Sequence, residues 1–329
     1  MSKYITLIAC FGLFSCSTIG YVSMESLYPS ELSFPLDVKS VGIVDNAVNH
    51  DTLLANGITI GKLEGDGKIM ARQFAVNLAD ANYFEYVMLC DSSLRSGTRM
   101  DAPLKLSQEK VRQLTSDLNV DMLVTVDGIS IKTWPDVELM GDPPYPVEVV
   151  EGEISTVISV YVPSRKEPMH LALGAQDTVF WELIGPLTEK YIVEDASSYG
   201  ASLPLKYLVP QWKPEERLYY SGGCVELRDA AVYVKENNWE DAFLLWKKSY
   251  ESSKSKSKKR MRSALNMALY YEMQSNIPEA LKYAKEAMDL AKPGSPDKKY
   301  ITFYYSAQLS DKSVKMQKLE LQMKRFDKK

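Results

Sequence analysis

The two histidines are the first residues to test for catalytic or metal-binding chemistry. His50 and His170 lie 120 residues apart, and the chain contains no H-x-x-x-H or C-x-x-C spacing that would hold a zinc ion. Ser221-Gly222-Gly223 does not complete a G-x-S-x-G nucleophile elbow, and no histidine lies near it in sequence. We therefore predict no catalytic residues, no metal site and no cofactor, and we expect a non-enzymatic protein. A hydrolase with an unrecognised site is kept as an alternative.

A glycine-rich segment precedes the first predicted helix and contains Gly57, Gly61, Gly65 and Gly67. A phosphate-binding loop needs glycine five residues before its Gly-Lys pair and a serine or threonine after it. Lys62 and Ile69 stand at those two positions around Gly67-Lys68, so the motif fails twice. A turn before a helix is the simpler interpretation.

Two clusters of like charge are the remaining polar features. Between Thr133 and Ser164 there are six acids and no Lys or Arg, namely Asp136, Glu138, Asp142, Glu148, Glu151 and Glu153. Such a segment could hold Ca²⁺ or a basic partner, but we favour an exposed acidic edge that discourages strand pairing. The basic cluster comprises Lys254, Lys256, Lys258, Lys259, Arg260 and Arg262. We expect a solvated loop there and no nucleic-acid partner; outside the cytosol the available polyanions are lipid headgroups and envelope polymers.

The N-terminus indicates where the protein works. One lysine is followed by about ten apolar residues from Tyr4 to Phe14, which fits a secretory signal and is half of a membrane span. Leu13-Phe14-Ser15-Cys16 resembles the lipobox of bacterial lipoproteins. The resemblance implies that residues 1–15 are a signal peptide and that Cys16 carries a covalent lipid, which would anchor the chain in a membrane. Ser17 after the cysteine resembles lipoproteins of the outer membrane, so we expect a periplasm-facing anchor.

Two further cysteines remain after Cys10 and Cys16 are assigned to the signal and the lipid. Cys90 and Cys224 could form a disulfide in an oxidising compartment. Two buried free thiols are the alternative that we favour, because the sequence does not show whether the two Cα atoms approach each other.

The length of 329 residues predicts two domains, and the charge divides accordingly. Residues 224–329 carry 22 Lys/Arg and 14 Asp/Glu, whereas the rest of the chain is acidic. After a tether over residues 16–35, alternating strand and helix patterns up to residue 126 predict a parallel βαβαβ unit. The later β-rich segments Ile129–Trp134, Glu148–Val162 and Leu171–Ile184 should add antiparallel strands. We thus expect a mixed α/β domain over residues 36–210 and a connection over residues 211–223.

The C-terminal part, residues 224–329, is predicted to be helical. Trp239, Ala242, Trp246 and Ser249 recur 38 residues later as Ile277, Ala280, Ala284 and Ala287. This pattern resembles a pair of tetratricopeptide repeats, whose period is 34 residues. The resemblance implies a concave, protein-binding groove. Lys235, Arg262 and Glu272 fall near its expected lining.

Taken together, the order of these parts resembles an uncharacterised class of bacterial envelope lipoproteins. The first domain is also similar in element order to the curli-secretion channel lipoprotein. The resemblance implies a membrane-anchored, non-enzymatic scaffold that binds a protein partner through its helical repeats. A subunit of an outer-membrane export or assembly complex is the alternative; the sequence does not indicate the oligomeric state.

Overall fold

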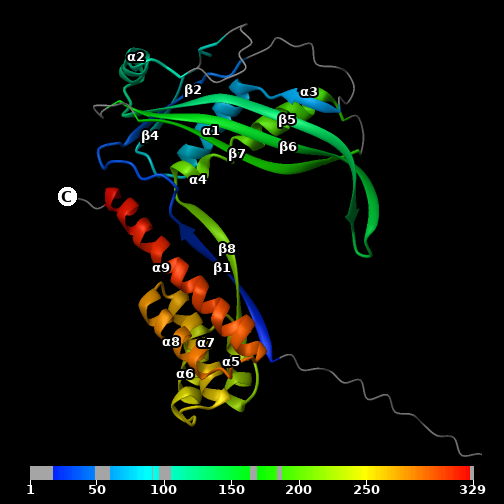
Figure 1. The fold of residues 1–329 in the computed structure, drawn as a ribbon, viewed down its shortest axis with the longest axis vertical. Coiled ribbons are helices and arrows are strands. Elements are labelled where there is room, and N and C mark those ends of the chain that lie inside the picture. The colour runs from blue at the N-terminus through cyan, green and yellow to red at the C-terminus, as the bar shows by residue number, and fades with distance from the viewer. Residues whose placement is uncertain are drawn as a thin grey trace, which may run out of the picture. The chain divides into compact units, whose positions relative to one another are not determined.

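A computed structural model of the chain describes residues 18–48, 60–90, 92–95, 105–163, 169–183 and 187–326. The chain forms two compact units (Figure 1). The α/β unit comprises Tyr28–Gln211 and Leu319–Lys329, and the helical unit comprises Met1–Leu27 and Trp212–Lys318. The predicted fold class, a mixed α/β sheet followed by a helical part, is confirmed. The predicted signal peptide, Cys10, Cys16, His50 and Gly57 lie outside the described residues, as does the side chain of His170.

The α/β unit is built on a six-stranded mixed sheet. The strand order is β4-β2-β5-β6-β7, with β3 paired to β5. Its strands are β2 Ser40–Asp45, β3 Gly61–Glu64, β4 Tyr86–Cys90, β5 Met122–Met140, β6 Tyr145–Val162 and β7 Met169–Glu182. β2 is parallel to both β4 and β5, whereas β6 and β7 are antiparallel, as the sequence predicts. The two predicted strands on either side of Asp127 form the single strand β5, with a register shift between Val126 and Gly128.

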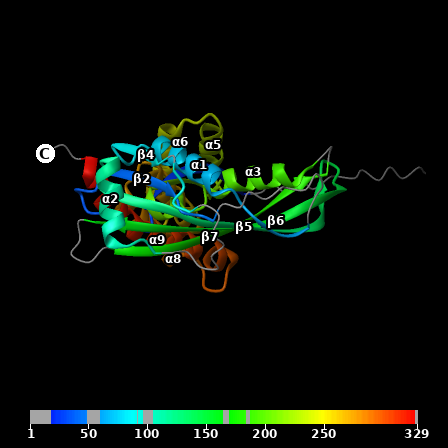
Figure 2. The same ribbon diagram turned by 90° about the horizontal axis from the view of Figure 1, so that it is seen from above.

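Helices cover both faces of the parallel strands. Alternate residues of β2 point to opposite sides, so Ile43 packs against α1 (Gly67–Asp80) and Val44 packs against α2 (Gln108–Leu118). Figure 2 shows α1 and α3 (Glu189–Gly200) along the same face of the sheet. Helix α3 was not predicted from the sequence, although Thr188 caps it and its apolar residues recur at helical spacing. A short helix, α4 (Leu205–Leu208), follows.

The end of the chain belongs to the α/β unit, not to the helical domain predicted for residues 224–329. Helix α9 (Phe303–Met323) is followed by the 3₁₀ turn η2 (Lys324–Phe326). The amide of Gln322 accepts a hydrogen bond from Ser30 N and donates to Ser30 O and Leu32 O, each at 3.0 Å. Arg325 lies over the Tyr83 ring, 4.3 Å from its centroid. Both contacts are buried or part-buried, which explains why this turn stays with the sheet.

The helical unit contains two successive helical hairpins. The first joins α5 (Val225–Lys235) to α6 (Trp239–Glu251), and the second joins α7 (Lys258–Met273) to α8 (Ile277–Leu290). The turns match at the 38-residue offset. Asn237 and Ser275 have left-handed backbones, with φ of 58° and 57°, and Asn238 and Asn276 cap the second helices. Of the eight side chains predicted to recur in α6 and α8, seven are buried, namely Ala242, Trp246, Ser249, Ile277, Ala280, Ala284 and Ala287, whereas Trp239 at the start of α6 is half-buried. A π-helical segment, Asp297–Thr302, leads into α9.

The predicted tether and connection are wrong, because both segments form strands. β1 (Ile19–Tyr28) and β8 (Gln211–Tyr220) pair as a two-stranded sheet (Figure 1). Ile19, Val22, Met24 and Leu218 pack against the core of the helices. Asn266 of α7 holds the end of β8 by accepting from Tyr220 N at 2.7 Å and donating to Tyr220 O at 2.8 Å. This strand pair therefore covers α7, and it begins three residues after Cys16.

Within the described ranges, none of the helices is long and apolar enough to cross a membrane.

Candidate functional site

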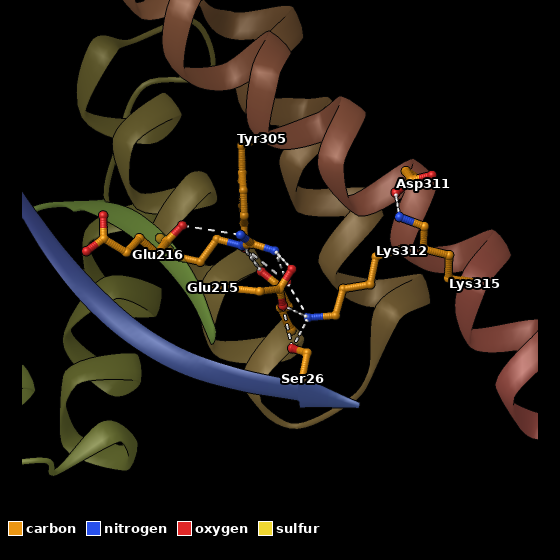
Figure 3. A network of polar contacts seen from close by, with 9 residues as sticks. Ser26, Glu215, Glu216, Tyr305, Asp311, Lys312 and Lys315 are labelled. Atoms are coloured by element: carbon orange, nitrogen blue, oxygen red, sulfur yellow. Dashed lines mark hydrogen bonds and ion pairs between the residues drawn. The ribbon is translucent and has the colours of Figure 1, made fainter. Parts of the chain in front are cut away.

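A dense group of buried polar and ionisable side chains lies inside the helical unit (Figure 3). It consists of Ser26, Glu215, Arg217, Glu272, Tyr305 and Lys312. We call these six residues the charge network. Its two acids and two bases balance in charge, and each lies in the protein interior with a side chain at most 10% exposed.

The contacts within the charge network are short. Arg217 Nη2 lies 2.8 Å from Glu215 Oε1 and 2.9 Å from Glu272 Oε1, while Arg217 Nε donates to Glu272 Oε2 at 3.0 Å. Lys312 Nζ donates to Glu215 Oε2, Glu272 Oε1 and Ser26 Oγ, all at 2.7 Å. Tyr305 Oη donates to Glu272 Oε2 at 2.7 Å. All three ammonium hydrogens of Lys312 are thus used within the network.

Secondary structure positions each member. Side chains two residues apart in a strand share a face, so β8 presents Glu215 and Arg217 together. Tyr305 and Lys312 are two turns apart on α9, which places them on one side of that helix. The last turn of α7 supplies Glu272, and β1 supplies Ser26, whose hydroxyl donates to Glu215. The network therefore joins four elements that are distant in sequence.

The surroundings of Arg217 and Tyr305 fix the protonation states of these two side chains. Burial alone would lower the pKa of Arg217, but its contacts with Glu272 and Glu215 raise that pKa above the ordinary value. Burial and the neighbouring Glu272 carboxylate raise the pKa of Tyr305 well above its ordinary value. Arg217 therefore stays charged and Tyr305 stays protonated. The arrangement resembles a structural clamp more than a general acid–base pair, because its donors and acceptors satisfy one another.

A small pocket of about 130 Å³ lies beside the network. Its lining includes the apolar residues Met24, Trp212, Met273, Ile277 and Met316 together with Glu272 and Lys312 of the network. This volume is below the roughly 300–1,000 Å³ of typical small-molecule sites. Because Glu272 and Lys312 already bond to each other within the network, the pocket offers mainly apolar contacts.

A second buried polar cluster lies in the α/β unit, at the carboxyl end of β2, where its parallel pairing with β5 stops. Asp127 sits at the register shift of β5 and accepts hydrogen bonds from Thr125 Oγ1 at 2.7 Å, Asn46 Nδ2 at 2.8 Å and the hydroxyl of Ser159. Ligands of open α/β sheets bind at this edge. Here, the carboxylate oxygens of Asp127 already accept hydrogen bonds from side chains of the same unit.

The three residues predicted to line a groove do not share a surface. Lys235 is exposed at the end of α5, but Glu272 is buried in the charge network. Arg262 donates to Gly222 O at 2.8 Å and lies over the ring of Tyr220, 4.9 Å from its centroid. The prediction is wrong because β8 and the loop after it cover α7. The alternation of Glu215, Arg217 and Tyr219 in β8 was the sequence signal for this strand.

The other predicted sites can also be placed. Cys90 and Cys224 are free thiols in different units, so the disulfide is not formed; Cys224 Sγ lies 3.5 Å from Ser249 Oγ. The N-terminus of α1 is capped by Asp66, whose carboxylate accepts from Ile69 N at 2.9 Å. Among the residues that the structure describes, no group of three or more His, Cys, Asp and Glu is placed to hold a metal ion.

The acidic segment is not the sheet edge that the sequence suggested. Its residues lie on β5 and β6, which pair with each other, whereas β4 and β7 end the strand order. Beyond Val149, where pairing to β7 ends, residues 137–148 form a two-stranded hairpin tip. Val137, Leu139 and Tyr145 are exposed there, Leu139 by 70%.

Comparison with known proteins gives family membership without an activity. No curated protein matches the sequence. A solved structure of a hypothetical protein from Chlamydia trachomatis is 9% identical and covers 42% of this chain and 71% of that chain, with a TM-score of 0.21, which is too low to support an argument. Residues 228–311 match the domain of unknown function DUF6340. Residues 38–220, more than half of the chain, match the domain of unknown function DUF8603, and the chain belongs to that family.

Proposed function

We propose that the protein is a membrane-anchored, non-enzymatic scaffold of the bacterial envelope that binds a protein partner. The proposal of partner binding is supported by the hairpin tip, residues 137–148, which extends beyond β7 (Figure 1). It exposes Val137 and Leu139 on one face, whereas the exposed Tyr145, which pairs with Met140, lies on the other face. Exposed apolar clusters rimmed by polar residues are typical of interaction sites. The tip also carries Glu138, Asp142 and Glu148 and no Lys or Arg, which favours a partner with basic groups around an apolar patch.

The helical repeats do not offer the open groove that was predicted from the sequence, but they support a scaffold role in another way. Their α7 side is closed by β1 and β8, and the charge network locks this closure. A closed helical unit can act as a rigid support. The saturated network and the saturated Asp127 cluster also favour a non-enzymatic role, since a general acid or base needs a substrate within hydrogen-bond reach.

A photoreactive amino acid in place of Leu139 is expected to form one discrete adduct in living cells. A matched probe at Tyr191, which is also exposed in the α/β unit, should form none. Val137→Glu should reduce the Leu139 adduct about tenfold or more, because burying an apolar side chain contributes about 1.5–3 kcal/mol. Equal labelling from both positions would contradict a binding role for the hairpin tip.

Anchoring through Cys16 predicts covalent lipid on the mature chain. Cells expressing the protein should incorporate labelled palmitate into it, and Cys16→Ala should abolish the label. Cys90→Ala is the matched control and should keep it, because that thiol lies at the end of β4 in the α/β unit and not in the predicted lipobox. Intact mass spectrometry provides the decisive reading: a mature chain with an unmodified N-terminus would exclude the anchor.

A further inference from the structure

Three parts of the helical unit meet where β1 begins. Thr18 O accepts from Ser221 N at 3.0 Å, and Thr18 Oγ1 accepts from Arg262 Nη2 at 3.5 Å. Arg262 lies in the first half of α7, so the start of that helix is at the same end. Asp297 joins them, since Tyr220 Oη donates to it at 2.6 Å and Lys258 Nζ lies 3.1 Å away. We call this region, defined by Thr18, Arg262 and Asp297, the anchor end.

The anchor end is basic. Residues 252–262, the loop before α7 and its first turns, contain six Lys or Arg and no acid. Lys254 and Lys256 are exposed, and so is Lys292 in the segment before Asp297. Of the nearby acids, Glu226 pairs with Lys259 at 3.2 Å, Glu286 with Arg260 at 2.9 Å and Asp297 with Lys258 at 3.1 Å, while Glu251, just before this segment, is exposed. The exposed lysines therefore give this end an excess of positive charge.

Exposed aromatic side chains occur in the segment that follows Asp297. Tyr300, Phe303 and Tyr304 follow Asp297 by one to two turns and are 63%, 57% and 63% exposed. Phe303 and Tyr304 follow Tyr300 by three and four residues. This spacing places the three rings on one side of the continuous helix formed by the π-helical segment and the start of α9. Aromatic rings beside lysines are typical of segments that lie at a membrane–water interface, where the rings enter the headgroup layer and the ammonium groups meet anionic lipids.

We propose that the anchor end of the helical unit binds the surface of an anionic phospholipid membrane directly, with Phe303 and Tyr304 in the headgroup layer and Lys254 and Lys256 on the phosphates. The charge of this end matches such a surface, and so does its position in the chain. Cys16 precedes Thr18 by only two residues in the sequence, so a lipid on Cys16 would be attached to the chain next to this end. The proposal rests on the proposed lipid anchor, which would hold this end against the membrane.

The test uses the mature chain, residues 17–329, without its lipid, so that any binding comes from the protein surface and not from the acyl chains. Sedimentation with vesicles of phosphatidylethanolamine and phosphatidylglycerol should bring the chain down, whereas vesicles of phosphatidylcholine alone should not. Binding should weaken as the salt concentration rises, because exposed charges are screened. Lys254→Ser/Lys256→Ser should lower the partition coefficient roughly tenfold or more, on the basis of about 1 kcal/mol per lysine.

Matched variants separate the surface from general charge and folding effects. Phe303→Ser/Tyr304→Ser should lower binding by about tenfold, whereas Val314→Ser, farther along α9 and 67% exposed, should not. Lys235→Ser/Lys282→Ser removes the same charge from α5 and α8 away from the anchor end and should leave most of the binding. Circular dichroism checks that each variant is folded.

Two results would overturn the proposal: no binding to the anionic vesicles by the unsubstituted chain, or equal losses from the anchor-end and control variants. Neither result depends on acylation, because no protein in the test carries lipid. Loss of palmitate labelling in cells would instead refute the anchor itself, so the two failures can be told apart.

Discussion

Glu272→Gln is expected to lower the free energy of unfolding of the helical unit by about 3–5 kcal/mol, the usual cost of removing one partner from a buried ion pair. Glu272 receives hydrogen bonds from Arg217, Lys312 and Tyr305, and its side chain is fully buried. Without its charge, two buried cations would share Glu215 alone. Urea denaturation followed by far-ultraviolet circular dichroism measures the change, fitted with one transition for each unit where the units unfold separately.

Two further variants show whether charge balance is the cause. Glu279→Gln removes a similar carboxylate from an exposed pair with Lys282, 2.9 Å away, and should leave the free energy of unfolding nearly unchanged. Glu272→Gln/Lys312→Met removes one charge of each sign and should recover a large part of the loss, since an apolar replacement of a buried pair is often neutral. Equal destabilisation by Glu272→Gln and Glu279→Gln would show that the network contributes little to stability.

Asp127→Ala should produce the corresponding loss in the α/β unit, about 3–5 kcal/mol. Its carboxylate is the acceptor for Thr125, Asn46 and Ser159, all buried, and each hydrogen bond to a charged group contributes about 1.5–3 kcal/mol. Alanine would leave those three donors without this acceptor at the register shift of β5. The same denaturation experiment reports the change.

The control for Asp127 is Asp142→Ala, at the exposed turn of the hairpin tip, which should have almost no effect on stability. Asp127→Asn keeps one carbonyl acceptor in the same shape and should fall between wild type and Asp127→Ala. If Asp127→Ala were as stable as wild type, the cluster would not be a stability element, and a role for this edge of the sheet in ligand binding would gain weight.

The elements that the sequence determines are those built from neighbouring residues. Apolar residues at helical spacing, such as Met70, Phe74 and Leu78, specify α1, and alternation of strands and helices specifies the parallel part of the sheet. The recurrence of Ala242 at Ala280 likewise specifies two helical hairpins with matching turns. In each case, the local pattern decides which face is buried, and no distant contact is required.

Only the tertiary structure decided how β1, β8, α7 and α9 come together. Ser26 and Glu215 are 189 residues apart, and Ser30 and Gln322 are 292 apart, so no local period connects them. The segment that forms β8 was predicted to be a connection, because a lone strand with Glu and Arg carries no signal of its buried partners. Glu272 was likewise predicted to line an open groove, because the sequence does not show that β8 covers it. Buried ion pairs are favourable only when every partner is in place, and that placement exists only in the folded chain.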